Sequence, residues 1–243
     1  MSVHRTDSGR VAVLTLDRPQ RRNALDLDAL DELHAAVVAA VDSGARALVV
    51  TGAGGHFCAG ADLTELEDVS FTQRLAEVLR HLAGLPVLTV AAVEGACMGL
   101  GMQLALACDV RVVADTARFA VPVARLGLMV DHWTLERLAR LWGDGAARHL
   151  VLAAAVLDAD DAWRLGFTQV RGGLEQAVAL AGNAAELAPL TQSGSKAGLA
   201  TAAGDTAAVA RYEAAFARAW ASADLVEGRA AFRERRDPRF TGR

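Results

Sequence analysis

Apolar residues in the first half of the chain follow two alternating spacings, and each spacing predicts one kind of element. Short continuous apolar runs bounded by turn residues are typical of buried strands, whereas apolar residues three and four positions apart indicate amphipathic helices. The predicted strands are 11–16, 47–51, 86–93 and 110–114, and the predicted helices are 28–41, 71–82 and 101–108. Because these strands are too apolar to be half-exposed, we expect a layered α/β fold.

The pattern becomes helical after about residue 134. The predicted helices of this part are 135–142, 146–155, 160–165, 174–187, 196–202 and 206–221. A boundary near Pro189 would divide the chain into a core of residues 1–188 and a helical region of residues 189–243. The last stretch, 233–239, is strongly charged, and its composition alone fits a solvated tail as well as a functional segment.

Composition narrows the possible classes of protein. A chain of 243 residues suits one large domain, alone or with a small appendage. Hydrophobic residues make up 53% of it, which excludes long disordered stretches. The net charge of −4 argues against nucleic acid as the main partner. All but one of the 25 basic residues are arginine, the exception being Lys196, so any binding of anions would depend on arginine.

The three cysteines lie among apolar neighbours and lack the spacing of metal ligands. Their odd number, together with an N-terminal sequence that does not resemble a signal peptide, predicts reduced thiols in a cytoplasmic protein. The six histidines do not form a His-Glu-x-x-His motif, so we expect no metal or other cofactor. No uninterrupted apolar run approaches 18 residues, so we expect no membrane span.

Three short motifs are better explained by local structure than by chemistry. Residues 52–55 lack the Gly-Lys-Ser/Thr of a phosphate-binding loop, and residues 99–104 lack the third glycine of a dinucleotide-binding motif. Ser193 and Lys196 fit the Ser-x-x-Lys pattern of serine acyl-enzymes. No companion motif accompanies that pair, so we interpret it as a helix N-cap followed by an exposed lysine.

Two glycine-flanked segments, 56–63 and 94–104, are more informative. Each follows a predicted buried strand, and the second also opens a predicted helix. Their small residues let backbone N–H groups approach a ligand, and the first turn of a helix has unpaired N–H groups and a positive dipole potential. Two such donors on one carbonyl oxygen would stabilise an enolate or oxyanion. Taken alone, either segment would be better explained as a tight turn between strand and helix.

Several stretches in a specific order give the chain a strong family resemblance. They are Arg-Pro-Gln-Arg-Arg-Asn-Ala-Leu at 18–25, Phe-Cys-Ala-Gly-Ala-Asp-Leu at 57–63, the segment 95–109 with the Arg-Val-Val-Ala that follows it, Phe119, Gly127-Leu128 and the end at 231–240. With them the chain resembles the enoyl-CoA hydratase/isomerase (crotonase) superfamily over nearly its full length. The resemblance implies a ββα spiral with a C-terminal helical region that supports homotrimers, often paired into hexamers.

The resemblance also implies a binding site for a fatty acyl-CoA. The donors that match the family's oxyanion hole are the backbone N–H groups of Ala61 and Leu100, which would hold the thioester oxygen. The positions that match its CoA-binding segments are Arg21, Arg22, Asn23, Ala59, Phe232 and Arg235. At Arg235 the family usually has a lysine, so the positive charge is preserved.

Two departures from the family pattern concern its catalytic glutamates. Hydratases of the family use two of them to activate water and to protonate the α-carbon. At those positions this chain has Gln103 and Val123. An amide can orient water but cannot take its proton, and valine can do neither. Because general acid–base groups contribute about 10²–10⁴-fold to rates, losing both should remove efficient hydration.

One acid remains where some isomerases of the family have a catalytic aspartate. Asp131 would move a proton between the α and γ carbons of an enoyl-CoA, or would cap a helix that begins at Trp133 or Thr134. His132 is a weaker catalytic candidate. Gln103, Val123, His132 and Trp133 are expected to line the acyl pocket. Asp62 is expected to support the first oxyanion segment.

Three functional hypotheses follow. The first is an acyl-CoA-binding protein that sequesters or delivers a fatty acyl thioester, as the resemblance to an actinobacterial subgroup without both glutamates implies. The second is an enoyl-CoA isomerase that uses Asp131. The third is a weak enoyl-CoA hydratase of fatty-acid metabolism. The environment of Asp131 separates the first two, because a carboxylate tied to backbone N–H groups favours binding. A regulatory protein without any acyl-CoA is a more distant alternative.

Overall fold

The principal sheet has six strands in the order β1-β2-β3-β4-β6-β9 in the computed structural model, which describes residues 1–62, 69–202, 204 and 206–243. The strands are β1 (Val3–Ser8), β2 (Val11–Leu16), β3 (Ala47–Gly52), β4 (Leu88–Val93), β6 (Val110–Val113) and β9 (Val170–Arg171). β1 pairs with β2 antiparallel, and the later pairings are parallel. A smaller sheet joins β5 (Ala96–Met98), β7 (Arg118–Ala120) and β8 (Val156–Asp158).

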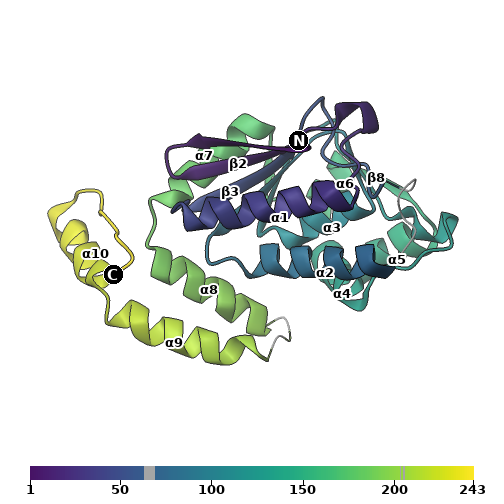
Figure 1. Ribbon diagram of the computed structural model, residues 1–243. Helices are drawn as coiled ribbons and strands as arrows, with labels where there is room; N and C mark the ends of the chain where they lie inside the picture. The colour runs from purple at the N-terminus through teal and green to yellow at the C-terminus, as the bar shows by residue number, and fades with distance from the viewer. Residues whose placement is uncertain (63–68, 203, 205) are drawn as a thin grey trace.

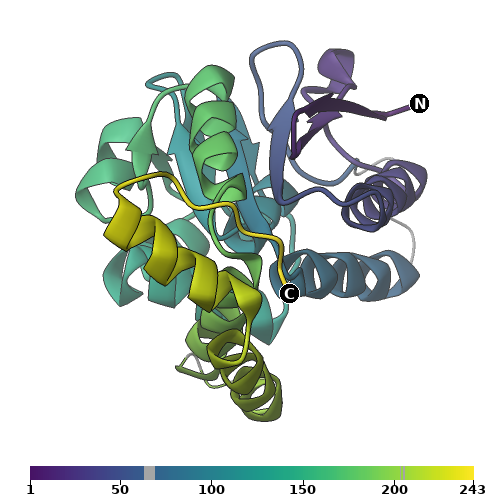
Figure 2. The same cartoon turned by 90° about the vertical axis from the view of Figure 1, so that its left-hand side faces the viewer.

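Helices cover both faces of the six-stranded sheet, which explains why its strands are continuously apolar. In β3, Leu48 and Val50 belong to the larger core, whereas Ala47 and Val49 pack on the opposite face. The larger core includes α1 (Leu27–Asp42), α2 (Val69–Gly84) and α3 (Leu100–Ala107). The opposite face is covered by α7 (Leu174–Ala185), visible on the other side of the sheet in Figures 1 and 2.

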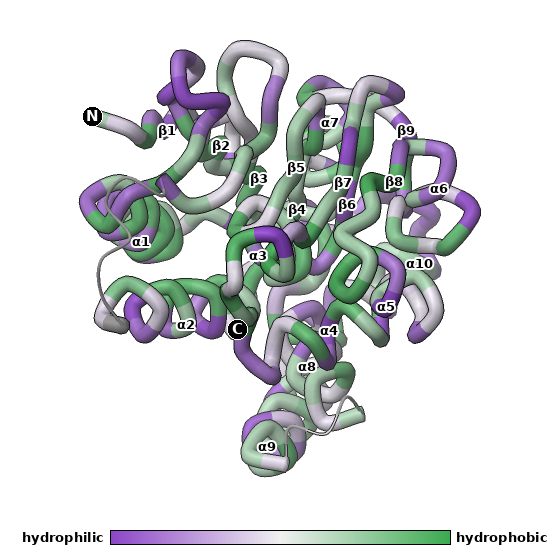
Figure 3. Tube along the Cα trace, turned by 90° about the vertical axis from the view of Figure 1, so that its right-hand side faces the viewer, coloured by the Kyte–Doolittle hydropathy of each residue, from purple (hydrophilic) through white to green (hydrophobic). Residues whose placement is uncertain are grey.

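The remaining elements connect the two sheets and form the C-terminal region. They are the short 3-10 helices η1 (Pro19–Arg21) and η2 (Pro122–Arg125) and the helices α4 (His132–Trp142), α5 (Asp144–Leu152), α6 (Ala159–Arg164), α8 (Pro189–Ala202), α9 (Ala208–Trp220) and α10 (Ala223–Glu234). α8 packs against α9, and α10 extends away from the sheets (Figure 1). Figure 3 shows α9 standing well apart from the strands. Among the described residues, no helix is long and apolar enough to cross a membrane.

The interpretation of Ser193 and Lys196 as an N-cap and an exposed lysine is wrong. α8 begins at Pro189, and the Ser193 hydroxyl donates within the helix to the carbonyl of Leu190. The Lys196 ammonium donates to Asp109 Oδ2 at 2.7 Å and to the Val87 carbonyl at 3.1 Å. Lys196 therefore fastens α8 to the loops beside β4 and α3.

The three cysteines are free and buried, as predicted. Burial raises the pKa of Cys58 and of Cys108 to about 12. Because the thiolate is the reactive form, these side chains serve as small apolar core residues.

Candidate functional site

The two glycine-flanked segments lie side by side at the carboxyl ends of β3 and β4. The N–H of Cys58 donates to the Ala96 carbonyl at 2.9 Å, and the Cys58 carbonyl accepts from the N–H of Met98 at 2.9 Å. On its other side, the first segment pairs with Leu25 through an isolated bridge to Ala61. The segment 94–104 is described throughout, whereas Leu63 of the first segment lies outside the described residues.

Glycine is required where the second segment enters α3. Gly99 precedes the helix with a φ of 51° and a ψ of −111°, a backbone conformation that residues with a Cβ rarely adopt. Gly101 follows in the first turn, and a Cβ there would lie 2.2 Å from the carbonyl oxygen of Cys58. A residue with a Cβ at position 101 would therefore force the two segments apart.

This approach leaves two backbone donors at one cavity. Within the described residues, no acceptor receives the N–H of Ala61 or that of Leu100, the first residue of α3. Both residues line a cavity of about 190 Å³, together with Ala59. Because α3 begins at Leu100, its positive dipole end reinforces that donor. The arrangement suits a carbonyl oxygen that gains negative charge.

The far end of α3 is held by two arginines. Arg137 Nε donates to the carbonyl of Leu106 at 2.9 Å, and a terminal nitrogen of Arg111 donates to the carbonyl of Cys108 at 3.0 Å. Burial lowers the pKa of Arg111 to about 10, so it remains charged at neutral pH. Cations suit the negative end of a helix, and here they also satisfy its last carbonyls.

The walls of this cavity are mostly apolar. One wall is α2, which contributes Phe71, Leu75 and Leu79. The opposite wall is the loop after η2, where Leu128 is 41% and Met129 is 88% exposed. A cavity with an apolar lining and a few polar groups at one end suits a ligand with an apolar chain and a polar head.

The two positions at which the resemblance implies glutamates in hydratases both line the cavity. Val123 lies in η2, and Gln103 lies one turn after Leu100 on α3. The Gln103 amide donates through Nε2 to the hydroxyl of Thr134 at 2.8 Å. No carboxylate lies at either position.

Asp131, which also lines the cavity, is the N-cap of α4. Its Oδ1 accepts the backbone N–H of Thr134 at 3.2 Å and the Thr134 hydroxyl at 2.5 Å. Its Oδ2 lies 3.5 Å from a terminal nitrogen of Arg80 on α2. The carboxylate thus has a structural partner on each oxygen. The sequence had offered this cap as one of two roles for Asp131, although α4 begins at His132 and not at Trp133 or Thr134. No sequence signal pointed to Arg80.

The segment expected near CoA has an exposed part and a buried part. Arg21 is exposed and lies 3.6 Å from Asp62, and Arg22 is also exposed. The carbonyl of Arg22 accepts the N–H of Ala59 at 2.9 Å. Asn23 is fully buried, and its amide makes three hydrogen bonds, to the backbone of Arg18, Ala53 and His56. Its side chain holds the loop and has no exposed surface.

Other expected site residues lie outside this cavity. His132 is exposed, and Trp133 packs under the guanidinium of Arg137, so neither lines the cavity as expected. Phe232 is 86% exposed on α10, and Arg235 ends that helix. Within one chain, the structure does not bring Phe232 or Arg235 together with the oxyanion segments.

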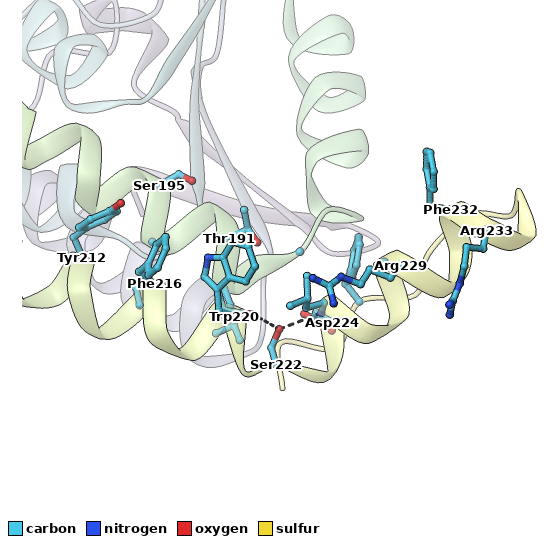
Figure 4. Close-up of a pocket in the computed structure, with 18 residues that line it drawn as sticks. Thr191, Ser195, Tyr212, Phe216, Trp220, Ser222, Asp224, Arg229, Phe232 and Arg233 are labelled. Carbon is cyan, nitrogen blue, oxygen red and sulfur yellow. Dashed lines mark hydrogen bonds between the residues drawn. The ribbon is translucent and has the colours of Figure 1, made fainter.

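Phe232 instead lines a second, larger cavity of about 810 Å³ between α8, α9 and α10. Figure 4 shows Tyr212, Phe216 and Trp220 of α9 presenting their rings along it. Phe216 is 52% and Trp220 is 60% exposed. Such a row of exposed aromatic side chains is typical of a surface that another molecule covers.

Two histidines lie at the contact between α1 and α2, and the pKa of one of them is lowered. The rings of His34 and His81 are 4.8 Å apart, and each has a buried Nδ1 without a partner among the described residues. Burial, and then the charges of Arg74 and His81, lower the pKa of His34, against smaller opposing contributions from Asp31 and Glu77.

Because the unfolded chain then binds a proton more readily than the folded protein, stability should fall as the pH drops below about 6.5. Denaturant titrations between about pH 7.5 and about pH 5 should show this loss, and His34→Gln should reduce it. The exposed His149 provides the matched control, His149→Gln. Equal slopes for His34→Gln and the unaltered protein would contradict the prediction.

Comparison with known proteins shows to which family the chain belongs. The family model described as enoyl-CoA hydratase/isomerase matches residues 6–243. The chain belongs to the enoyl-CoA hydratase/isomerase family. It is 39% identical over 238 residues to a protein of Mycobacterium tuberculosis named probable enoyl-CoA hydratase echA6, covering 98% of each chain. It is 34% identical over 248 aligned residues to crotonyl-CoA hydratase of Syntrophomonas wolfei, covering 95% of this chain and 94% of that protein.

Solved structures of the family share the fold. A Geobacillus kaustophilus structure titled as enoyl-CoA hydratase subunit I superposes with a TM-score of 0.90 at 32% identity, covering 100% of this chain and 99% of that one. The predicted crotonase fold with a helical C-terminal region is therefore confirmed. Among the described residues there is no group of three or more His, Cys, Asp or Glu side chains that could hold a metal ion.

Proposed function

We propose that this family member binds a fatty acyl-CoA thioester and hydrates it little or not at all. The thioester oxygen would accept hydrogen bonds from the backbone N–H groups of Ala61 and Leu100. The observation that carries the proposal is that these two donors lack an acceptor within the described residues and line one cavity. The acyl chain would lie between α2 and the loop after η2, whose apolar side chains match it.

The lack of a general base supports binding over hydration. Gln103 cannot accept a proton from water, and Val123 presents only methyl groups to the place where water would be held. The relatives named as enoyl-CoA hydratases favour the alternative of a weak hydratase in fatty-acid metabolism. General acid–base groups contribute about 10²–10⁴-fold each, so any such activity would be slow.

The isomerase alternative rests on Asp131, and the contacts of that carboxylate weigh against it. It caps α4 through Oδ1 and lies 3.5 Å from Arg80 through Oδ2, so a proton taken up on either oxygen would disturb one of these interactions in each cycle. An N-cap typically contributes about 1 kcal/mol.

The contribution of the C-terminal region is expected to come from a neighbouring copy. Phe232 and Arg235 lie too far along α10 to line the cavity of their own chain, so they would reach the CoA of another subunit. A homotrimer, or a dimer of trimers, in which residues 189–243 form the contact would also cover the aromatic row of α9. In such an assembly Arg21 and Arg22 would meet the CoA phosphates.

The variant Leu100→Pro tests the oxyanion donor. Proline is tolerated at the first position of a helix, where it removes the N–H, and it also replaces the buried leucine side chain. We expect an affinity for butanoyl-CoA about tenfold lower by calorimetry, and a smaller infrared shift of the bound thioester carbonyl. Leu100→Ala keeps the N–H while shortening the side chain, and serves as the control. Unchanged affinity and carbonyl frequency in Leu100→Pro would overturn the assignment.

Product analysis separates the alternatives. Incubation with 2-enoyl- and 3-enoyl-CoA, followed by mass spectrometry, should yield no 3-hydroxyacyl-CoA at the rates of an efficient hydratase. Conversion of 3-enoyl- to 2-enoyl-CoA that Asp131→Asn abolishes would establish the isomerase instead. Rapid hydration would show that the interpretation of Gln103 and Val123 is wrong.

A further inference from the structure

The hydrogen bonds from Gln103 to Thr134 and from Thr134 to Asp131 can run in one direction only, because of which groups can donate and which can accept. The Asp131 carboxylate accepts on both oxygens, since Oδ1 receives the backbone N–H of Thr134 and Oδ2 lies 3.5 Å from a terminal nitrogen of Arg80. The single hydroxyl hydrogen of Thr134 is therefore donated to Asp131 Oδ1. Thr134 Oγ1 is left as an acceptor, and it must receive its bond from the NH₂ group of Gln103.

The consequence is that the Gln103 amide cannot rotate freely. Its NH₂ group is committed to Thr134, which is fully buried, so its carbonyl Oε1 is the free end. Gln103 is 7% exposed and lines the cavity, and Oε1 has no partner among the described residues. Because Oε1 is not fully buried, it remains accessible from the cavity. The cavity thus presents an acceptor at this point.

The place of this acceptor relative to the thioester follows from the helix. Gln103 is three residues after Leu100, so both lie on one face of α3, about 5–6 Å apart. A thioester oxygen on the N–H of Leu100 would put the first acyl carbons beside Oε1. A hydroxyl on those carbons would donate to Oε1, whereas a carbonyl oxygen there would face another acceptor.

We infer that Gln103 Oε1, held in place by Thr134 and Asp131, selects acyl thioesters that carry a hydroxyl group, and disfavours those that carry a carbonyl, on the carbon two bonds from the thioester carbonyl. Gln103 is the specificity-determining residue, and Thr134 and Asp131 are positioning residues. The inference rests on the proposed acyl-CoA site and adds the class of acyl group that the site prefers.

Three ligands of equal length test this preference: 3-hydroxybutanoyl-CoA in both enantiomers, 3-oxobutanoyl-CoA and butanoyl-CoA. Calorimetry on the unaltered protein should show at least one hydroxy enantiomer binding about tenfold more tightly than the oxo ligand, which corresponds to one neutral hydrogen bond gained and one repulsive contact avoided. Gln103→Leu should reduce this ratio to within about threefold.

The direction of the hydrogen bonds is tested at Thr134. Thr134→Val keeps the shape but removes the hydroxyl, which frees the amide to rotate, so the ratio should fall about as far as in Gln103→Leu. Thr134→Ser keeps the hydroxyl and should restore the preference. Thr168→Val is the matched control, because Thr168 is also buried but its hydroxyl lacks a partner among the described residues. A loss caused only by general destabilisation would not be rescued by serine.

The outcomes distinguish this inference from the proposed function. If all three ligands bind with equal affinity, the acyl-CoA site stands and the selection by Gln103 is overturned. If Thr134→Val keeps the full ratio, the positioning role of Thr134 is overturned. If none of the ligands binds, both the proposed function and the inference fail.

Discussion

Alanine at position 101 should abolish acyl-CoA binding and destabilise the protein strongly. The added Cβ would lie 2.2 Å from the carbonyl oxygen of Cys58 and 3.0 Å from its carbonyl carbon, both parts of the backbone. Neither atom can rotate away, so α3 and the first segment must separate, and the N–H groups of Ala61 and Leu100 separate with them. Overpacking of this kind costs about 1–3 kcal/mol, and sometimes more. Denaturant titration and calorimetry with butanoyl-CoA measure the two effects.

A second glycine provides the control with the opposite sign. Gly182 lies inside α7, and a Cβ there would meet nothing within 4 Å. Gly182→Ala should therefore raise stability by about 0.5–1 kcal/mol through helix propensity and leave ligand binding unchanged. If Gly101→Ala behaved like Gly182→Ala, the close approach of the two segments would not be required for binding.

Trp142→Ala should lower the free energy of unfolding by about 3–5 kcal/mol. The indole is 1% exposed and stacks on Phe167 with ring centroids 4.3 Å apart, while Phe119 meets it edge-on at 5.3 Å. Removing it leaves a large cavity where α4 packs against β7. Urea titration measures the loss.

Trp163 is the matched control for this prediction. It is 46% exposed on α6, with Arg171 above its ring. Trp163→Ala should cost no more than about 1 kcal/mol, because little buried area is lost. Similar losses for the two variants would show that the aromatic cluster around Trp142 is not a principal source of stability.

The sequence predicted best those elements whose two faces are both buried. The strand 11–16 matches β2 and the strand 47–51 matches β3 to within one residue, because helices on both faces make such strands continuously apolar. β1 was not predicted, since it is an antiparallel strand at the edge whose residues are mostly polar. β5, β7 and β8 have three residues each, too few for any periodicity.

The C-terminal helices were predicted less well for a related reason. The prediction missed α10, and began the helix that is α8 at residue 196 although it begins at Pro189. Their apolar residues are largely exposed within one chain, so no regular buried stripe marks them. Where apolar residues are buried only against another molecule, the sequence of one chain does not show which face of the helix is covered.

The sequence predicted those cavity residues that were expected to act through their backbone N–H groups or that match the family pattern. Ala61 and Leu100 were found through the glycines around them, and Gln103 and Val123 through the family pattern, and all four line the cavity. The contacts of Asp131 required the structure, because Arg80 lies on a helix 51 residues earlier in the chain. The same limit explains why His132 and Trp133 were expected in a cavity that they do not line.

The contact of the Lys196 ammonium with Asp109 makes opening of α8 measurable by proteolysis. Lys196 is the chain's single lysine, so an endoprotease that cleaves only after lysine has one possible site. That site lies within α8, and the side chain that the enzyme must grasp is held by Asp109. Cleavage therefore requires α8 to unwind and Lys196 to leave its partner. Its rate would report how often the C-terminal helices open while the sheets remain folded.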